Sequence, residues 1–225
     1  VTQEKVEGMI AWLNVRQKAV DDAKRDTPHQ EVQLWHYTEV NHVVLAKEDG
    51  RPALVNKVLP KVPVDYVSYS AYDTTNEADP TKIKAALNYI ESQLLPNPEI
   101  KGKRVFIGEY GFPAISGGTD TPRPPDKTNA LSLIVMKAGI EWGCPFVLYW
   151  ELYNNEVTPE GLQKGFWMID DKGEKMPVYD SHVRYYAWAR KFVADHFERT
   201  GAVPDDAVFR KAAVDFLDSI TPKGN

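Results

Sequence analysis

The stretch that decides the fold is RVFIGEYGFP, residues 104–113. Apolar and small residues run from Val105 to Gly108 and lead directly into Glu109. A strand that is buried on both faces has a continuous apolar run, without the alternation of a half-exposed strand. A carboxylate in this setting costs free energy unless it has partners or a function. We therefore predict a buried parallel strand that presents Glu109 at its carboxyl end, where α/β proteins build their sites. Alternatively, Glu109 caps the next helix or pairs with an arginine.

Three other apolar runs end in polar residues, as this one does. Strands are predicted over 32–37, 64–70, 104–108 and 146–150. Helical periodicity appears over 2–26, 51–62, 80–94, 127–143, 178–200 and 207–217, and a Gly-, Thr- and Pro-rich loop over 115–126. Strands that alternate with helices indicate parallel β/α units, so the predicted class is α/β. The four strands form either a small open sheet or strands five to eight of a TIM (β/α)8 barrel, which makes the chain a partial barrel.

Length and composition limit the function. The 225 residues fit a single domain over 1–225, with a tail over 201–225 that holds the last helix. A net charge of −5 gives no reason to expect a nucleic-acid partner or an anionic membrane. Neither nucleotide-binding glycine motif is present, and no cofactor is expected. Cys144 is the only cysteine, which excludes an internal disulfide and a metal site built on several thiolates.

Three segments near the end of the chain carry a family resemblance. FVLYWE at 146–151 follows the Glu109 strand, and GFWMID at 165–170 is followed by Gly173 and by PVY at 177–179. In this order they resemble the C-terminal half of the retaining (β/α)8-barrel glycoside hydrolases. The resemblance covers roughly residues 30 to 195. It implies strand seven at 104–111, strand eight at 146–151, a carbohydrate substrate and, by analogy alone, a secreted or periplasmic location.

The resemblance implies catalytic roles for two glutamates. In that superfamily a glutamate after strand seven is the nucleophile and one after strand four is the acid/base residue, which matches Glu109 to the nucleophile. No Asn-Glu pair follows a strand at the position of strand four. The resemblance therefore implies an acid/base residue upstream of Val1. If the strand count is shifted, Glu39 is the acid/base residue, with Asn41 beside it.

The remaining candidates each have a structural alternative. Tyr72 is expected to donate a hydrogen bond to Glu109, or to be an ordinary interior tyrosine. Trp150 is expected to stack on a sugar, or to pack in the core. His36 would contact a sugar hydroxyl or the glutamate, or be a core histidine. Glu151 would bind hydroxyl groups, or belong to a solvated loop.

Two further hypotheses concern metals and self-association. His36, His42 and Glu39 match no strong metal-binding spacing, so no metal is expected. A rival to the hydrolase is a non-catalytic carbohydrate-binding or structural half-barrel. Such a half-barrel would associate with a second copy through its exposed sheet edges.

Overall fold

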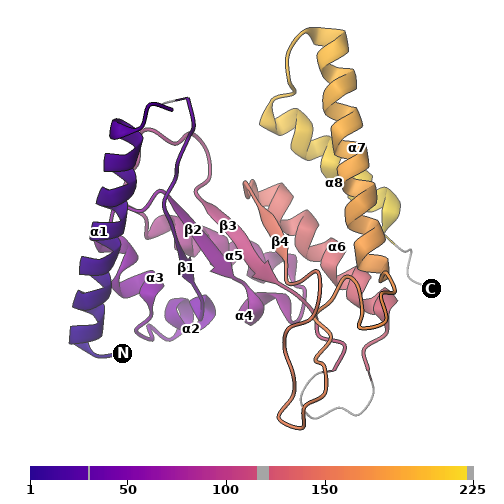
Figure 1. Ribbon diagram of the computed structural model, residues 1–225, viewed down its shortest axis with the longest axis horizontal. Coiled ribbons are helices and arrows are strands. Elements are labelled where there is room, and N and C mark those ends of the chain that lie inside the picture. Colours follow the sequence, from indigo (N-terminus) through magenta and orange to yellow (C-terminus); the bar gives the residue numbers. More distant parts are fainter. Residues whose placement is uncertain (30, 116–121, 222–225) are drawn as a thin grey trace. The chain divides into compact units, whose positions relative to one another are not determined.

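The structure is a computed structural model that describes residues 1–29, 31–115 and 122–221 (Figure 1). The chain divides into two compact units, and each is described by itself. The first unit comprises Val1–Thr75, Thr81–Glu109 and Cys144–Leu148, and the second comprises Asn76–Pro80, Tyr110–Gly143 and Tyr149–Asn225. Within the described residues, no helix combines the length and apolar character needed to cross a bilayer.

The first unit contains a four-stranded parallel sheet. Its strands are β1 (Tyr37–Val40), β2 (Tyr66–Ser70), β3 (Val105–Tyr110) and β4 (Val147–Tyr149). The last residues of β3 and β4 are grouped with the second unit. The strand order is β1-β2-β3-β4, so each strand lies beside its neighbour in the sequence. The predicted α/β class with parallel strands is confirmed.

The helices of the first unit follow the sequence prediction in part. They are α1 (Gln3–Asp26), α2 (Val43–Glu48), α3 (Leu54–Lys57), the 3-10 helix η1 (Leu59–Lys61), α4 (Tyr72–Thr75) and α5 (Pro80–Ser92). Thr2 caps α1 by accepting the Lys5 amide at 3.4 Å. The long helices α1 and α5 were both predicted, whereas α2 and α4 are too short for helical periodicity to show.

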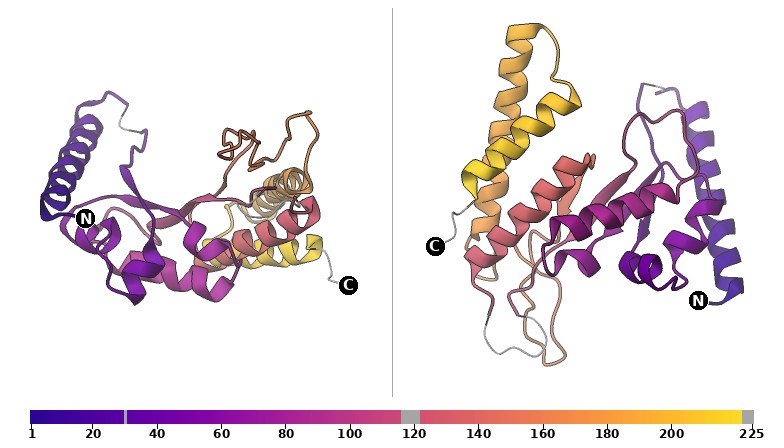
Figure 2. Two further views of the ribbon diagram at one scale, coloured as in Figure 1. Left: turned by 90° about the horizontal axis from the view of Figure 1, so that it is seen from below. Right: turned by 180° about the vertical axis from the view of Figure 1, so that it is seen from behind.

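One face of the sheet is buried and the other is open. Val67, Tyr69, Val105 and Ile107 are fully buried on the first face. Figure 1 shows α5 behind the strands, and the view from behind in Figure 2 shows it in front of them. The apolar residues Ile83, Leu87 and Ile90 of α5 are also fully buried.

The opposite face, which we call the open face, is marked by Tyr37, Phe106, Phe146 and Leu148. The Phe106 ring lies edge-to-face with Tyr37 and with Phe146, at centroid distances of 5.8 Å and 5.5 Å. Tyr37 is 53% exposed, Phe146 55% and Leu148 46%. Parallel sheets normally have both faces covered. The open face is therefore an unusual apolar surface for a sheet of this kind.

The second unit is helical, with a long loop after β4. Its helices are α6 (Pro125–Trp142), α7 (Pro177–Thr200) and α8 (Asp206–Ile220), and α6 packs against both others. Trp188 of α7 stacks on Phe216 of α8, with ring centroids 4.9 Å apart. The helix predicted for the 201–225 tail is α8. Residues 222–225 of that tail, and 116–121 of the predicted loop, lie outside the described residues.

The predicted strand over 32–37 is wrong in its position. The strand begins only at Tyr37, and Val32 and Leu34 are 51% and 41% exposed. The Asp65 carboxylate accepts the backbone amide of His36 at 2.8 Å, just before pairing begins at Tyr37 and Tyr66. A side chain therefore takes the hydrogen bond that an earlier start of the strand would need.

Candidate functional site

Glu109 lies inside β3 and not after it. The pairing of β2 with β3 contains a bulge: Tyr69 is opposite Ile107, but the next residue, Ser70, is opposite Glu109. Gly108 is the extra residue. Successive strand residues point to opposite faces, so skipping one residue changes the face that Glu109 takes. The bulge places Glu109 on the same side of the sheet as Ser70.

The close fit of Gly108 explains why a glycine occupies the bulge. A Cβ atom on Gly108 would lie 1.7 Å from the Ser68 hydroxyl oxygen and 3.2 Å from the Phe106 ring. A Cβ atom would fit there only if the Ser68 hydroxyl turned away and the neighbouring side chains shifted. The glycine and the bulge together therefore determine where the Glu109 carboxylate points.

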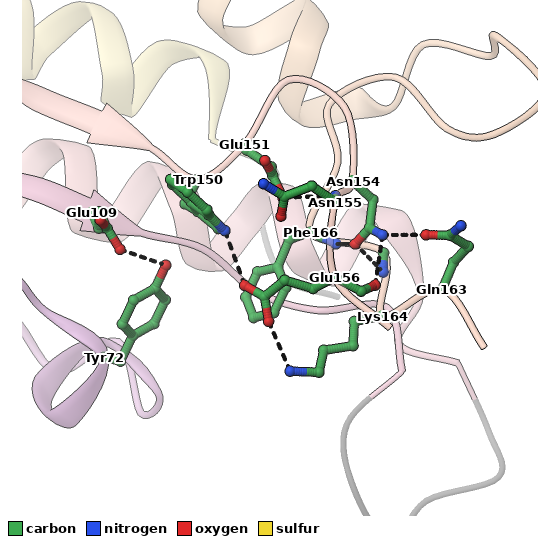
Figure 3. A network of polar contacts seen from close by, with 11 residues as sticks. Tyr72, Glu109, Trp150, Glu151, Asn154, Asn155, Glu156, Gln163, Lys164 and Phe166 are labelled. Carbon is green, nitrogen blue, oxygen red and sulfur yellow. Dashed lines mark hydrogen bonds and ion pairs between the residues drawn. The ribbon is translucent and has the colours of Figure 1, made fainter. Parts of the chain in front are cut away.

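Tyr72 reaches Glu109, as the sequence predicts. Its hydroxyl donates a long hydrogen bond of 3.4 Å to Glu109 Oε2 (Figure 3). Tyr72 begins α4, directly after Ala71, whose amide donates to the Glu109 backbone carbonyl at 2.8 Å. The main chain thus holds the start of α4 against the end of β3. Glu109 is half-buried.

A second carboxylate, Glu39, lies on the same side of the sheet. It is an exposed residue of β1 and accepts a hydrogen bond of 2.6 Å from the Ser70 hydroxyl. Glu39 pairs in register with Ser68, two residues before Ser70. Asn41 follows at the exposed end of β1. Glu39 was expected after the strand, but it lies within it because β1 begins later than predicted.

His36 is at the other end of β1 from these residues. It precedes the strand and is 4% exposed. Its Nδ1 donates to Gln17 Oε1 at 3.0 Å, and Gln17 Nε2 donates to Asp65 Oδ2 at 3.1 Å. The prediction that His36 ends a strand is therefore wrong, and the alternative of a core histidine describes its position.

Trp150 belongs to the second unit and is held from two sides. Its backbone amide donates to the Tyr110 carbonyl at 2.7 Å, and its indole Nε1 donates to Glu156 Oε1 at 3.2 Å. A Cβ atom on Gly111 would lie 2.1 Å from the Trp150 carbonyl oxygen, so the backbone approaches closely there. The peptide bond between Trp150 and Glu151 is cis. The side chain is half-buried.

Glu151 helps to fold the loop that follows Trp150. Its Oε1 accepts the Asn155 amide at 3.0 Å, and its own amide donates to the Phe166 carbonyl at 2.9 Å. Asn154 bridges the two sides of the loop, because its Oδ1 accepts the amides of Gly165 and Phe166 at 2.9 Å and 3.1 Å (Figure 3). The loop therefore has a defined internal hydrogen-bond network.

Comparisons with known proteins supply no relative. No protein-family model, no curated protein and no solved structure matches the chain. Within the described parts of the chain, no three His, Cys, Asp or Glu side chains gather as metal ligands would.

Three residues of these networks were not singled out from the sequence. They are Ser70, Glu156 and Lys164. Ser70 bonds to Glu39, 31 residues away, whereas Glu156 bonds to Trp150 and Lys164 to Glu156 over 6 and 8 residues. No periodic pattern marks such pairs. The only sequence signal was their position next to a predicted strand or within the loop after it.

Proposed function

We propose that the chain is the C-terminal half of a (β/α)8-barrel glycoside hydrolase, which cleaves a β-linked glycan with retention of configuration. Its four strands would be strands five to eight of the barrel. The observation that carries the proposal is Glu109, a half-buried carboxylate near the carboxyl end of a central parallel strand, with the Tyr72 hydroxyl as a donor 3.4 Å away. Sites of β/α barrels are built at this end of the strands.

The open face supports the barrel. The interior of a (β/α)8 barrel is filled by side chains from strands that close on themselves. Tyr37, Phe146 and Leu148 are about half exposed here, although they stand on a parallel sheet whose other face is covered. Further strands that complete a barrel would bury these side chains. The same closure would pair the free edges of β1 and β4.

The proposed reaction has two steps. The Glu109 carboxylate attacks the anomeric carbon, and the glycosidic C–O bond breaks as the acid/base residue gives its proton to the leaving oxygen. Water then attacks the anomeric carbon of the glycosyl-enzyme ester, giving its proton back to the acid/base residue and releasing Glu109. Tyr72 stabilises the ionised Glu109 by hydrogen bonding, which keeps the nucleophile charged. Trp150 stacks on an apolar sugar face.

The acid/base residue is proposed to lie outside these 225 residues, because the acid/base residue of the superfamily follows strand four, whereas Glu39 lies on the strand counted as the fifth. Retaining enzymes hold their two carboxyl groups about 5–5.5 Å apart. β1 and β3 are separated by β2, so their backbones lie roughly 9.6 Å apart at a strand spacing of about 4.8 Å. The backbone of Glu39 is also two residues out of register with that of Glu109, roughly 6.6 Å along the strands. Its carboxylate reaches Ser70, the register partner of Glu109, so Glu39 is the residue to test within these 225.

The test is covalent trapping of the nucleophile in the full-length protein. A fluorinated glycoside with a good leaving group forms a long-lived ester with the nucleophile, and peptide mass spectrometry locates it. We expect the adduct on Glu109. Glu109→Gln should lose at least about 10³-fold in turnover, because the amide cannot form the ester. Its melting temperature should stay close to that of the wild type.

The matched control is Glu39→Gln, the other exposed carboxylate on this side of the sheet. It should retain most activity if the acid/base residue lies elsewhere. An adduct on any other residue, or near-normal turnover of Glu109→Gln, would refute the assignment.

A second candidate is a non-catalytic half-barrel that binds carbohydrate or associates with a second copy. The open face favours it too, since a second copy could cover the same apolar side chains. Light scattering and an aryl-glycoside assay separate the candidates. A stable dimer that binds oligosaccharides without hydrolysis supports the second candidate, and hydrolysis supports the first.

A further inference from the structure

Both carboxylate oxygens of Glu156 are engaged in the loop after β4. Oε1 accepts the indole N–H of Trp150 at 3.2 Å, and Oε2 pairs with Lys164 Nζ at 2.7 Å (Figure 3). The side chains of Glu156 and Lys164 are about one-third exposed, at 34% and 37%. An indole has only this one N–H donor, so the hydrogen bond to Glu156 determines which way its polar edge points.

The backbone of Glu156 is also held. Its carbonyl accepts the side-chain Nδ2 of Asn154 at 2.7 Å and the backbone amide of Lys164 at 2.9 Å. Asn154 in turn accepts the amides of Gly165 and Phe166. The carboxylate that meets the indole therefore rests on a closed network within the second unit, and all its members lie in the loop itself.

We propose that Glu156 is a positioning residue, which fixes the indole plane of Trp150 for stacking on a sugar through its hydrogen bond to the indole N–H. The inference rests on the proposed function, because it takes the sugar-stacking role of Trp150 from there. A tryptophan whose ring is already oriented loses less rotamer entropy when it binds. Ordering one side chain costs about 0.5–1.5 kcal/mol, so losing this orientation should weaken binding about two- to thirteenfold.

The alternative is that Glu156 only joins the two sides of the loop through its ion pair with Lys164. Two substitutions separate these roles. Glu156→Gln keeps an oxygen that accepts the indole N–H but loses the ion pair, and Glu156→Ala loses both. A positioning residue predicts that Gln rescues the effect of Ala on Trp150. A loop ion pair predicts that the two variants are equally affected.

The first experiment reads the indole directly and requires no sugar. The full-length protein is labelled with 5-fluorotryptophan, and the Trp150 resonance in the ¹⁹F NMR spectrum is assigned by its absence in Trp150→Phe. Glu156→Ala should shift or broaden this resonance, whereas Glu156→Gln should leave it close to the wild type. Glu160→Ala is the matched control, since Glu160 is an exposed glutamate of the same loop. An unchanged resonance in Glu156→Ala, or equal changes in Ala and Gln, would overturn the inference.

The second experiment adds the sugar. Cellotetraose, laminaritetraose and mannotetraose are titrated while the Trp150 resonance is followed. For a sugar that shifts the Trp150 resonance, Glu156→Ala should raise the dissociation constant about two- to thirteenfold, with rescue by Gln. If none of the three shifts the Trp150 resonance, the stacking role in the proposed function fails. The first experiment still decides whether Glu156 orients the indole.

Discussion

At the scale of single residues, the buried network around His36 makes the stability of the folded protein depend on whether this histidine is protonated. The pKa of His36 is lowered, first because burial disfavours the charged ring and second because Arg16 is nearby, while Asp65 and Asp21 oppose the shift. Nδ1 donates to Gln17, and the buried Nε2 has no hydrogen-bond partner among the described residues. A proton added at Nε2 would be a buried donor without an acceptor, which costs free energy.

We predict that the protein loses stability in mild acid through His36. Its pKa is lower in the folded state than the unfolded value of 6.5, so below that pH the unfolded state binds more protons. The contribution of neutral His36 to the free energy of unfolding is therefore complete above about pH 6.5. It falls as the pH decreases, with a slope of at most about 1.4 kcal/mol per pH unit. Urea unfolding of the full-length protein between about pH 8 and about pH 5 measures this slope.

The informative variant is His36→Asn, whose side-chain amide can replace the Nδ1 donor but does not titrate. It should have a shallower pH dependence than the wild type, whatever its absolute stability. His29→Asn removes an exposed histidine and is the control. The pH dependence that remains in His36→Asn includes a contribution from His182, because burial also lowers the pKa of that histidine. An identical slope in His36→Asn and wild type would contradict the prediction.

At the scale of elements, the close pairing of β2 with β3 depends on the absence of a side chain at Gly108. We predict that Gly108→Ala destabilises the protein by roughly 1–3 kcal/mol, because the new Cβ would overlap the Ser68 hydroxyl. Ser68→Gly removes the clash, so the double variant should be more stable than the sum of the two single changes predicts. Chemical denaturation of all four proteins gives the coupling energy.

Gly8 is the control for Gly108, because its surroundings leave room for a side chain. Gly8 lies inside α1, and a Cβ there would have nothing within 4 Å. Gly8→Ala should therefore stabilise the protein by roughly 0.5–1 kcal/mol, since alanine loses less backbone entropy in a helix. If both alanine variants changed stability alike, the clash at Gly108 would not be the cause.

At the scale of the whole molecule, the barrel proposal requires that the open face of the sheet becomes buried in the full-length protein. Leu148 stands on that face and is 46% exposed, while Leu152 lies in the loop after β4 and is 47% exposed. In a closed barrel only Leu148 would become buried. We predict that Leu148→Ser costs about 2–3 kcal/mol in the full-length protein, and Leu152→Ser less than about 0.5 kcal/mol.

Denaturant midpoints of the two serine variants measure the difference. The comparison is direct because the substitution and the exposure are the same. Similar small effects at both positions would show that the open face stays exposed in the full-length protein, and the barrel proposal would fail with it.

The sequence by itself determined the α/β class, the sequential parallel strands and most helices. These follow from local periodicity, because an apolar run such as 104–108 or the helical spacing in 2–26 is encoded in neighbouring residues. It also indicated Glu109 and its contact with Tyr72, since the carboxyl ends of parallel strands share one edge.

Only the tertiary structure decided where β1 begins, which face Glu109 takes and what holds Trp150. The first two depend on partners distant in the chain, because Asp65 takes the His36 amide and β2 sets the bulge at Gly108. The third depends on how the loop folds, which brings Glu156 to the indole six residues away. A one-residue bulge reverses the face of a side chain without changing the apolar pattern that predicts the strand. Register is a property of two strands together, and the sequence of one strand does not contain it.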